Sequence, residues 1–114
     1  MNKINTFKLY ESFPQLYIGT NYSPFYASLK NGFEFKDGWF DLMYSFSKEL
    51  INYCIKNNLE IPKIVRAQQK CFKLDVSIKF KDYIKIKKED MNTIRKMISS
   101  LKEQSLLVPE NVAS

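Results

Sequence analysis

Residues 63–80 read KIVRAQQKCFKLDVSIKF, and this stretch decides the fold because its apolar and polar side chains alternate with the period of a β-strand. The alternation is unbroken in residues 72–80, where one side carries Phe72, Leu74, Val76, Ile78 and Phe80. Residues 63–70 predict a preceding strand, with Ile64, Arg66 and Gln68 opposite Val65, Ala67 and Gln69. Residues 84–86 predict a third strand. No Asn-Gly turn joins these segments, so the register of the strands stays open.

Helical periodicity brackets this stretch on both sides. Residues 38–58 place apolar side chains on an arc of about 220°, wider than the stripe of an ordinary surface helix. We therefore expect a long helix buried on more than one side, capped by Asp37 at its start and by Asn57 and Asn58 at its end. Full burial within the chain is the favoured interpretation, and any apolar remainder would be a partner surface. Residues 91–104, with Asp90 as a cap, predict a surface helix with a stripe of about 120°.

The sequence thus predicts an α+β fold, in which two helices pack on a small antiparallel sheet of two to four strands within residues 63–87. The length of 114 residues fits one domain. Residues 1–37 are rich in aromatic side chains and turn residues, so we expect an irregular layer over the core, with short strands at residues 16–18 and 33–35. Residues 105–114 are expected to form a loose tail.

The positive charge of the chain is concentrated in one segment. The net charge is +6, and residues 63–88 alone carry eight Lys, one Arg and two acidic residues. We expect a partner-binding surface there, formed by Lys70, Lys73, Lys79, Lys81, Lys85, Lys87 and Lys88, that meets a phosphate backbone or an acidic protein surface. The alternative is a solvated strand face whose lysines discourage aggregation. Sequence-specific base reading is not expected, because the 18 basic residues include only two Arg.

Several kinds of chemistry are excluded or disfavoured. The chain has no His, so it contains no Ser/His or Cys/His nucleophile pair. Cys54 and Cys71 form no CxxC motif, and we expect two reduced thiols in a reducing cytoplasm rather than a disulfide. No cofactor, metal or catalytic residue is expected, and no apolar run is long enough for a membrane span.

The stretch Asp37-Gly38-Trp39-Phe40 admits a structural and a chemical interpretation. In the structural one, Asp37 caps the helix, Gly38 allows a tight turn, and Trp39 anchors the first helical turn in the core. In the chemical one, Asp37 and Asp41, spaced i and i+4, share a metal ion with a third carboxylate. The structural interpretation is favoured, because the sequence places no third acidic ligand nearby.

This segment and two others resemble stretches of a known protein family. Three stretches resemble a family of small uncharacterised phage and prophage proteins: Phe13-Pro14-Gln15-Leu16-Tyr17, Gly32-Phe33-Glu34 and Asp37-Gly38-Trp39-Phe40-Asp41-Leu42-Met43. Residues 68–74 are similar to the Lys- and Phe-rich strand pair of that family. The chain departs from the pattern at Phe35-Lys36, where relatives have Cys-Gly, and it lacks their Cys-rich tail, so no metal site is carried over. The resemblance implies a phage or mobile-element protein in a bacterial cytoplasm.

Three functions follow as hypotheses. The first is a small non-catalytic binding protein that inhibits a host nucleic-acid-handling defence system, in the manner of anti-CRISPR proteins, by binding a host protein or ribonucleoprotein complex. The second is non-specific nucleic-acid binding through the Lys-rich sheet face, which would weaken steeply with salt. The third is a metal-dependent enzyme built on carboxylates near Asp37.

Overall fold

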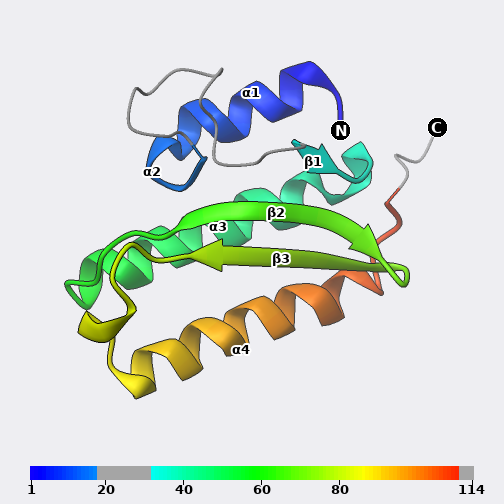
Figure 1. Ribbon diagram of the computed structural model, residues 1–114. Coiled ribbons are helices and arrows are strands. Elements are labelled where there is room, and N and C mark those ends of the chain that lie inside the picture. Colours follow the sequence, from blue (N-terminus) through cyan, green and yellow to red (C-terminus); the bar gives the residue numbers. More distant parts are fainter. Residues whose placement is uncertain (18–31, 111–114) are drawn as a thin grey trace.

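The structure is a computed structural model that describes residues 1–17 and 32–110. Its α+β architecture, four helices and a small sheet, confirms the fold class predicted from the sequence (Figure 1). The helices and strands, in chain order, are α1 (Lys3–Ser12), α2 (Pro14–Tyr17), β1 (Phe33–Glu34), α3 (Phe40–Lys56), β2 (Lys63–Lys70), β3 (Lys73–Lys79) and α4 (Lys88–Ser105). Two short 3-10 helices, Asp37–Trp39 and Tyr83–Lys85, precede α3 and α4.

The sheet is mixed, with the strand order β1-β2-β3. The β2–β3 hairpin is antiparallel, as predicted, but β1 pairs with β2 in the parallel sense, with Phe33 opposite Ala67. Parallel neighbours need a crossover connection, and α3 supplies it between β1 and β2. The expected strand at residues 33–35 is therefore confirmed at Phe33–Glu34, whereas the expectation of a purely antiparallel sheet is wrong.

One side of the hairpin packs on the core. The cross-strand pairs on this side are Ile64–Ile78, Ala67–Val76 and Gln69–Leu74. In Figure 1 helix α3 passes behind the hairpin, and α4 lies along the outer edge of β3. There Ser105 Oγ of α4 accepts a hydrogen bond of 2.9 Å from the backbone N of Leu74. A bulge between Ile64 and Arg66 shifts the alternation in β2. Ile64 and Ala67 are therefore both buried, and the predicted grouping of Ile64 with Arg66 and Gln68 is wrong.

Helix α3 is the centre of the core, as its wide apolar arc predicts. Met43, Phe46, Leu50 and Cys54 are buried on it, while the flanking Tyr44 and Ile55 remain exposed. Asn57 is the C-cap, as expected, and Asn58 takes a left-handed backbone with φ of 53°. The N-terminal cap differs from the prediction, because no side chain caps α3 and the chain enters it through the Asp37–Trp39 turn.

Helix α4 confirms the predicted surface helix but begins three residues earlier, at Lys88. Its apolar stripe, Met91, Ile94, Met97, Ile98 and Leu101, packs on or against the core. Asp90 does not cap it. The Asp90 carboxylate instead accepts a hydrogen bond of 2.7 Å from the hydroxyl of Tyr53, which ties α4 to α3.

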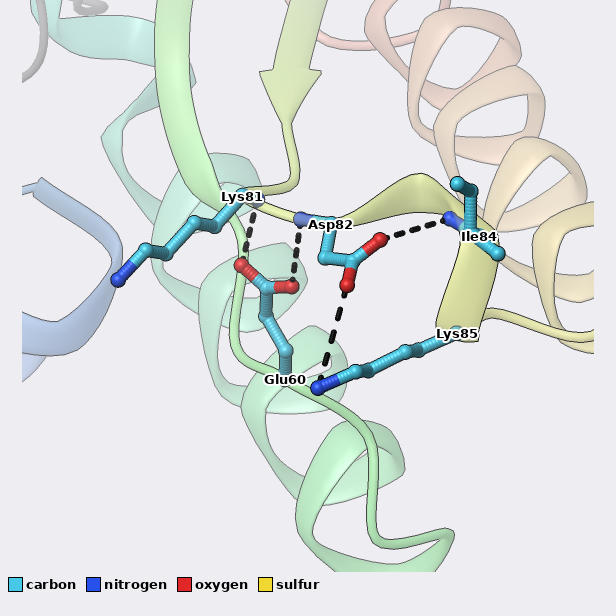
Figure 2. A network of polar contacts seen from close by, with 5 residues as sticks. All are labelled: Glu60, Lys81, Asp82, Ile84 and Lys85. Atoms are coloured by element: carbon cyan, nitrogen blue, oxygen red, sulfur yellow. Dashed lines mark hydrogen bonds and ion pairs between the residues drawn. The ribbon is translucent and has the colours of Figure 1, made fainter.

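The third strand predicted at residues 84–86 is wrong, because this segment contains a 3-10 helix with Ile84 96% exposed. Figure 2 shows how the loop is held. The Glu60 carboxylate accepts hydrogen bonds from the backbone N of Lys81 (2.5 Å) and of Asp82 (3.1 Å). Asp82 in turn caps the 3-10 helix by accepting from the backbone N of Ile84 at 3.1 Å. These contacts occupy backbone N–H groups that a strand would use for hydrogen bonds to a neighbouring strand.

The irregular N-terminal layer predicted from the sequence is wrong for residues 3–17, which are mostly helical. Leu9 and Tyr10 of α1 and Leu16 and Tyr17 of α2 are buried in the core. The strand predicted at residues 16–18 is therefore wrong at Leu16 and Tyr17, and Ile18 lies outside the described residues. The Tyr17 hydroxyl lies 2.5 Å from Ser47 Oγ, and burial raises the pKa of Tyr17.

Candidate binding surface

The seven lysines predicted to bind a partner are all exposed, but the structure does not align them in one row. Lys70 and Lys73 flank the hairpin turn. Lys79 ends β3, and the remaining four, Lys81, Lys85, Lys87 and Lys88, follow it around the second 3-10 helix. Residues 74–78 of β3 separate Lys73 from Lys79, which places these two groups about 20 Å apart along the strand. The predicted row is therefore divided between the two ends of the hairpin.

The side of the hairpin that faces away from the core is the open face. It is formed by the cross-strand pairs Lys63–Lys79, Arg66–Ser77, Gln68–Asp75 and Lys70–Lys73. In Figure 1 no described helix lies in front of it. The open face thus carries five cations and one carboxylate. Sequence reasoning missed Lys63 and Arg66 as members of this surface, because the bulge in β2 decides the side on which Arg66 lies.

The electrostatics of the open face are unbalanced. Lys70 and Lys73 stand directly opposite each other, an arrangement of like charges that destabilises a hairpin. The single carboxylate, Asp75, already has partners, since Lys102 Nζ lies 3.7 Å from it and Gln68 Nε2 lies 3.4 Å from it. Lys63 donates a hydrogen bond of 2.7 Å to the carbonyl O of Gln15, and burial lowers its pKa. The exposed charges of the face are therefore Arg66, Lys70, Lys73 and Lys79.

The hairpin turn adopts a backbone that its residues disfavour. Cys71 and Phe72 have φ values of 52° and 65°, in the left-handed region usually filled by Asn and Gly in two-residue hairpin turns. A left-handed residue other than Gly costs roughly 1–2 kcal/mol. Phe72 is 82% exposed, so the prediction that it faces the core with Leu74 is wrong. A two-residue turn between Lys70 and Lys73 removes Phe72 from the alternation of β3.

Phe72 belongs to an exposed apolar cluster, the tip patch, formed with Leu106 and Leu107. Leu106 is 53% and Leu107 85% exposed, and all three residues line one depression of about 290 Å³. Lys70 and Lys73 flank this patch on the hairpin side. Sequence reasoning missed it because residues 105–114 were expected to be a loose tail. The available signal was the Leu106-Leu107 pair, which follows α4 outside its apolar stripe.

The expectation of a loose tail is wrong for residues 105–110, because Ser105 ends α4 and residues 108–110 dock on the start of α3. Trp39 Nε1 donates a hydrogen bond of 2.8 Å to the carbonyl O of Val108, and the backbone N of Gly38 donates one of 2.7 Å to that of Glu110. Trp39 is only 2% exposed and contacts the ring of Phe35, with ring centroids 5.8 Å apart, which confirms its placement in the core. Residues 111–114 lie outside the described part.

Asp37 does not cap α3, and its carboxylate instead binds the start of α1, whose N-cap residue is Asn2. Its carboxylate accepts hydrogen bonds from the backbone N of Asn2 at 2.8 Å, from Asn2 Nδ2 at 3.1 Å and from Asn5 Nδ2 at 3.2 Å. These contacts, led by the backbone N–H of Asn2, lower the pKa of Asp37. The carboxylate that was considered for a metal site is thus engaged in holding α1, while Asp41 is exposed.

The two cysteines lie in different environments. Cys54 is buried and Cys71 exposed, and both are free thiols, as expected. Burial raises the pKa of Cys54 to about 11, so it is protonated at neutral pH. Within residues 1–17 and 32–110, no three His, Cys, Asp or Glu residues are grouped as a metal site would require. In the same ranges, no helix is long and apolar enough to cross a bilayer.

Replacement of Gly38 by alanine is expected to detach residues 106–110. An added Cβ would lie closer than 3.0 Å to the backbone carbonyl oxygens of Pro109 and Glu110, and a backbone neighbour cannot turn away as a side chain can. We expect a loss of about 2 kcal/mol of unfolding free energy, or about 8 °C in melting temperature by calorimetry. In a chain shortened after Ser105, the same replacement should be nearly neutral. An equal loss in both chains would show that the contact with the tail is not the cause.

Comparison with known proteins gives no match. No protein-family model matches the chain, and neither a curated protein nor a solved structure is significantly similar to it. The resemblance to small phage and prophage proteins therefore stays a prediction.

Proposed function

We propose that the chain is a small non-catalytic binding protein that docks on a host protein through the tip patch, within a bacterial cytoplasm. The observation that carries the proposal is the turn at Cys71 and Phe72, whose disfavoured backbone holds an aromatic side chain 82% exposed. Backbone strain is concentrated at functional sites in proteins, where surrounding structure maintains it for a purpose. Phe72 buries little of its side chain against the fold, so packing does not account for the disfavoured turn.

The composition of the tip patch favours a protein partner. An exposed aromatic residue beside Leu106 and Leu107 has the character of an interface anchor, which fills an apolar pocket and excludes water from it. Lys70 and Lys73, at the border of the patch, would meet carboxylates and speed association. The partner proposed is therefore a protein with an apolar pocket bordered by acidic side chains.

The proposed biological role is inhibition of a host system that handles nucleic acid, as anti-CRISPR proteins do. Small size, the basic hairpin and the resemblance to phage and prophage proteins support this role. Occupation of a protein interface requires no chemistry by the inhibitor, so the proposal includes no catalytic residue and no cofactor.

The test is affinity capture from a nuclease-treated bacterial lysate, followed by mass spectrometry. We expect a protein that is captured by the natural chain, lost with Phe72→Ser and retained with Ile84→Ser. Ile84 is the matched control, since it is 96% exposed and lies in the loop at the other end of the hairpin (Figure 2). Nuclease treatment removes proteins that are captured only through nucleic acid. If no captured protein distinguishes the two variants, the tip patch is not the docking surface.

A second candidate function, binding of nucleic acid, is favoured by a different observation. The open face carries Arg66, Lys70, Lys73 and Lys79 as exposed cations, and its only carboxylate is engaged by Lys102. The two functions are compatible, because a ribonucleoprotein target would offer both a protein pocket and a phosphate backbone.

A further inference from the structure

We infer that the open face of the β2–β3 hairpin binds the phosphate backbone of a duplex nucleic acid, independently of the tip patch. This inference rests on the second candidate function and deepens it by naming the ligand, and it uses another surface than the protein docking proposed for the tip patch. The face is formed by one side of two paired strands and is not covered by any described helix in Figure 1.

The open face carries four exposed cations. Arg66 and Lys70 lie on β2, and Lys73 and Lys79 lie on β3, so the charges are distributed along both strands. They extend over about 20 Å, the length of β3. With Asp75 occupied by Lys102, no free carboxylate of the face opposes an approaching anion. A linear polyanion would relieve the opposition of Lys70 and Lys73, since it places negative charge between them.

The side chains of the face favour a duplex over a single strand. Sites for single strands combine basic grooves with aromatic side chains on which the bases stack. The open face has no aromatic residue, since its remaining members are Lys63, Gln68, Asp75 and Ser77. Backbone contacts alone suffice for a duplex, whose bases are already stacked on one another. Three of the four exposed cations are lysines, which carry a point charge and lack the planar guanidinium that arginine uses to read base edges. No sequence preference is therefore expected.

These contacts predict a definite salt dependence. If all four exposed cations meet phosphates, the logarithm of the binding constant should fall against the logarithm of salt concentration with a slope of about −3.6. That slope corresponds to a loss of about 100-fold in affinity between about 50 and 200 mM salt.

The experiment measures fluorescence anisotropy of a labelled mixed-sequence duplex, and of its separated single strand, titrated with the full chain. The face variant replaces Arg66, Lys70, Lys73 and Lys79 by Gln. The control variant replaces Lys48, Lys56, Arg95 and Lys96 by Gln, which removes the same charge from exposed positions on α3 and α4. We expect the face variant to bind at least about tenfold more weakly with a slope near zero, and the control to keep most of the slope. Circular dichroism checks that both variants fold.

A gain of affinity provides a second measurement. Asp75→Asn removes the only carboxylate of the face and frees Lys102 from its ion pair, so duplex binding should strengthen by about threefold. A general loss of fold or of net charge does not produce such a gain.

Four results would overturn the inference. These are no duplex binding at low salt, equal losses in the face and control variants, tighter binding of the single strand, and equally tight binding of poly-glutamate, which would identify an acidic protein as the ligand. Phe72→Ser should leave duplex binding intact, so failure of the tip patch as a docking surface would not be mistaken for failure of this site.

Discussion

Replacement of Trp39 by alanine is expected to lower the free energy of unfolding by about 3–5 kcal/mol, the cost of removing a large buried aromatic side chain. Trp39 is 2% exposed, contacts the ring of Phe35, and donates its indole N–H to the carbonyl O of Val108. Alanine would leave a cavity and a carbonyl without its donor. The loss corresponds to a decrease of about 12–20 °C in melting temperature, which calorimetry measures directly.

Trp39→Phe separates the two parts of this effect. Phenylalanine keeps most of the apolar volume but cannot donate to Val108, so we expect a smaller loss of about 1–2 kcal/mol. If Trp39→Ala instead keeps its melting temperature and loses partner capture, Trp39 is a ligand-contacting residue and its assignment to the core is wrong.

Replacement of the hairpin turn by Asn-Gly, as Cys71→Asn with Phe72→Gly, is expected to stabilise the fold and abolish partner binding. Both positions have positive φ, where Asn and Gly are preferred, so relief of strain should raise the unfolding free energy by about 2 kcal/mol. Little packing is lost, because Phe72 is 82% exposed. The proposed docking on a host protein should disappear together with the aromatic side chain.

Two measurements report on this variant, namely urea denaturation for stability and lysate capture for binding. Cys71→Asn alone is the matched control, since it relieves part of the strain while keeping Phe72. It should show a smaller stabilisation and retain capture. A double variant that is no more stable than the natural chain would show that the turn is not strained. A double variant that still captures the partner would remove Phe72 from the interface.

The parts of the fold that could be predicted are the helices and strands whose own sequence identifies the side that is buried. The apolar residues of α3, α4 and β3 recur at the period of their element, and their burial follows from that period. The parts that could not be predicted depend on distant residues. The start of α1 is held by Asp37, which accepts from the backbone N of Asn2, 35 positions away, and the loop after β3 is held by Glu60 rather than by strand pairing.

The candidate surfaces follow the same division. Exposure of Lys73 and Lys79 could be predicted, because they lie on the opposite side of β3 from Leu74 and Val76. The arrangement of the lysines could not, since the bulge near Arg66 and the two-residue turn decide which charges share a face. The tip patch could not be predicted from the sequence for a related reason. Phe72 continues the alternation of β3 in the sequence, and only the position of the turn removes it from the core.

The docking of the C-terminal segment on the start of α3 has a consequence for folding kinetics. The contacts of Trp39 with Val108 and of Lys36 with Glu110 join positions 69 and 74 residues apart. Closing so long a loop costs chain entropy before the contacts stabilise the chain. These contacts are therefore expected to form late in folding, after the transition state. Interactions made after the transition state slow unfolding without speeding folding. Docking of residues 106–110 is therefore expected to slow unfolding and so to lengthen the lifetime of the native state.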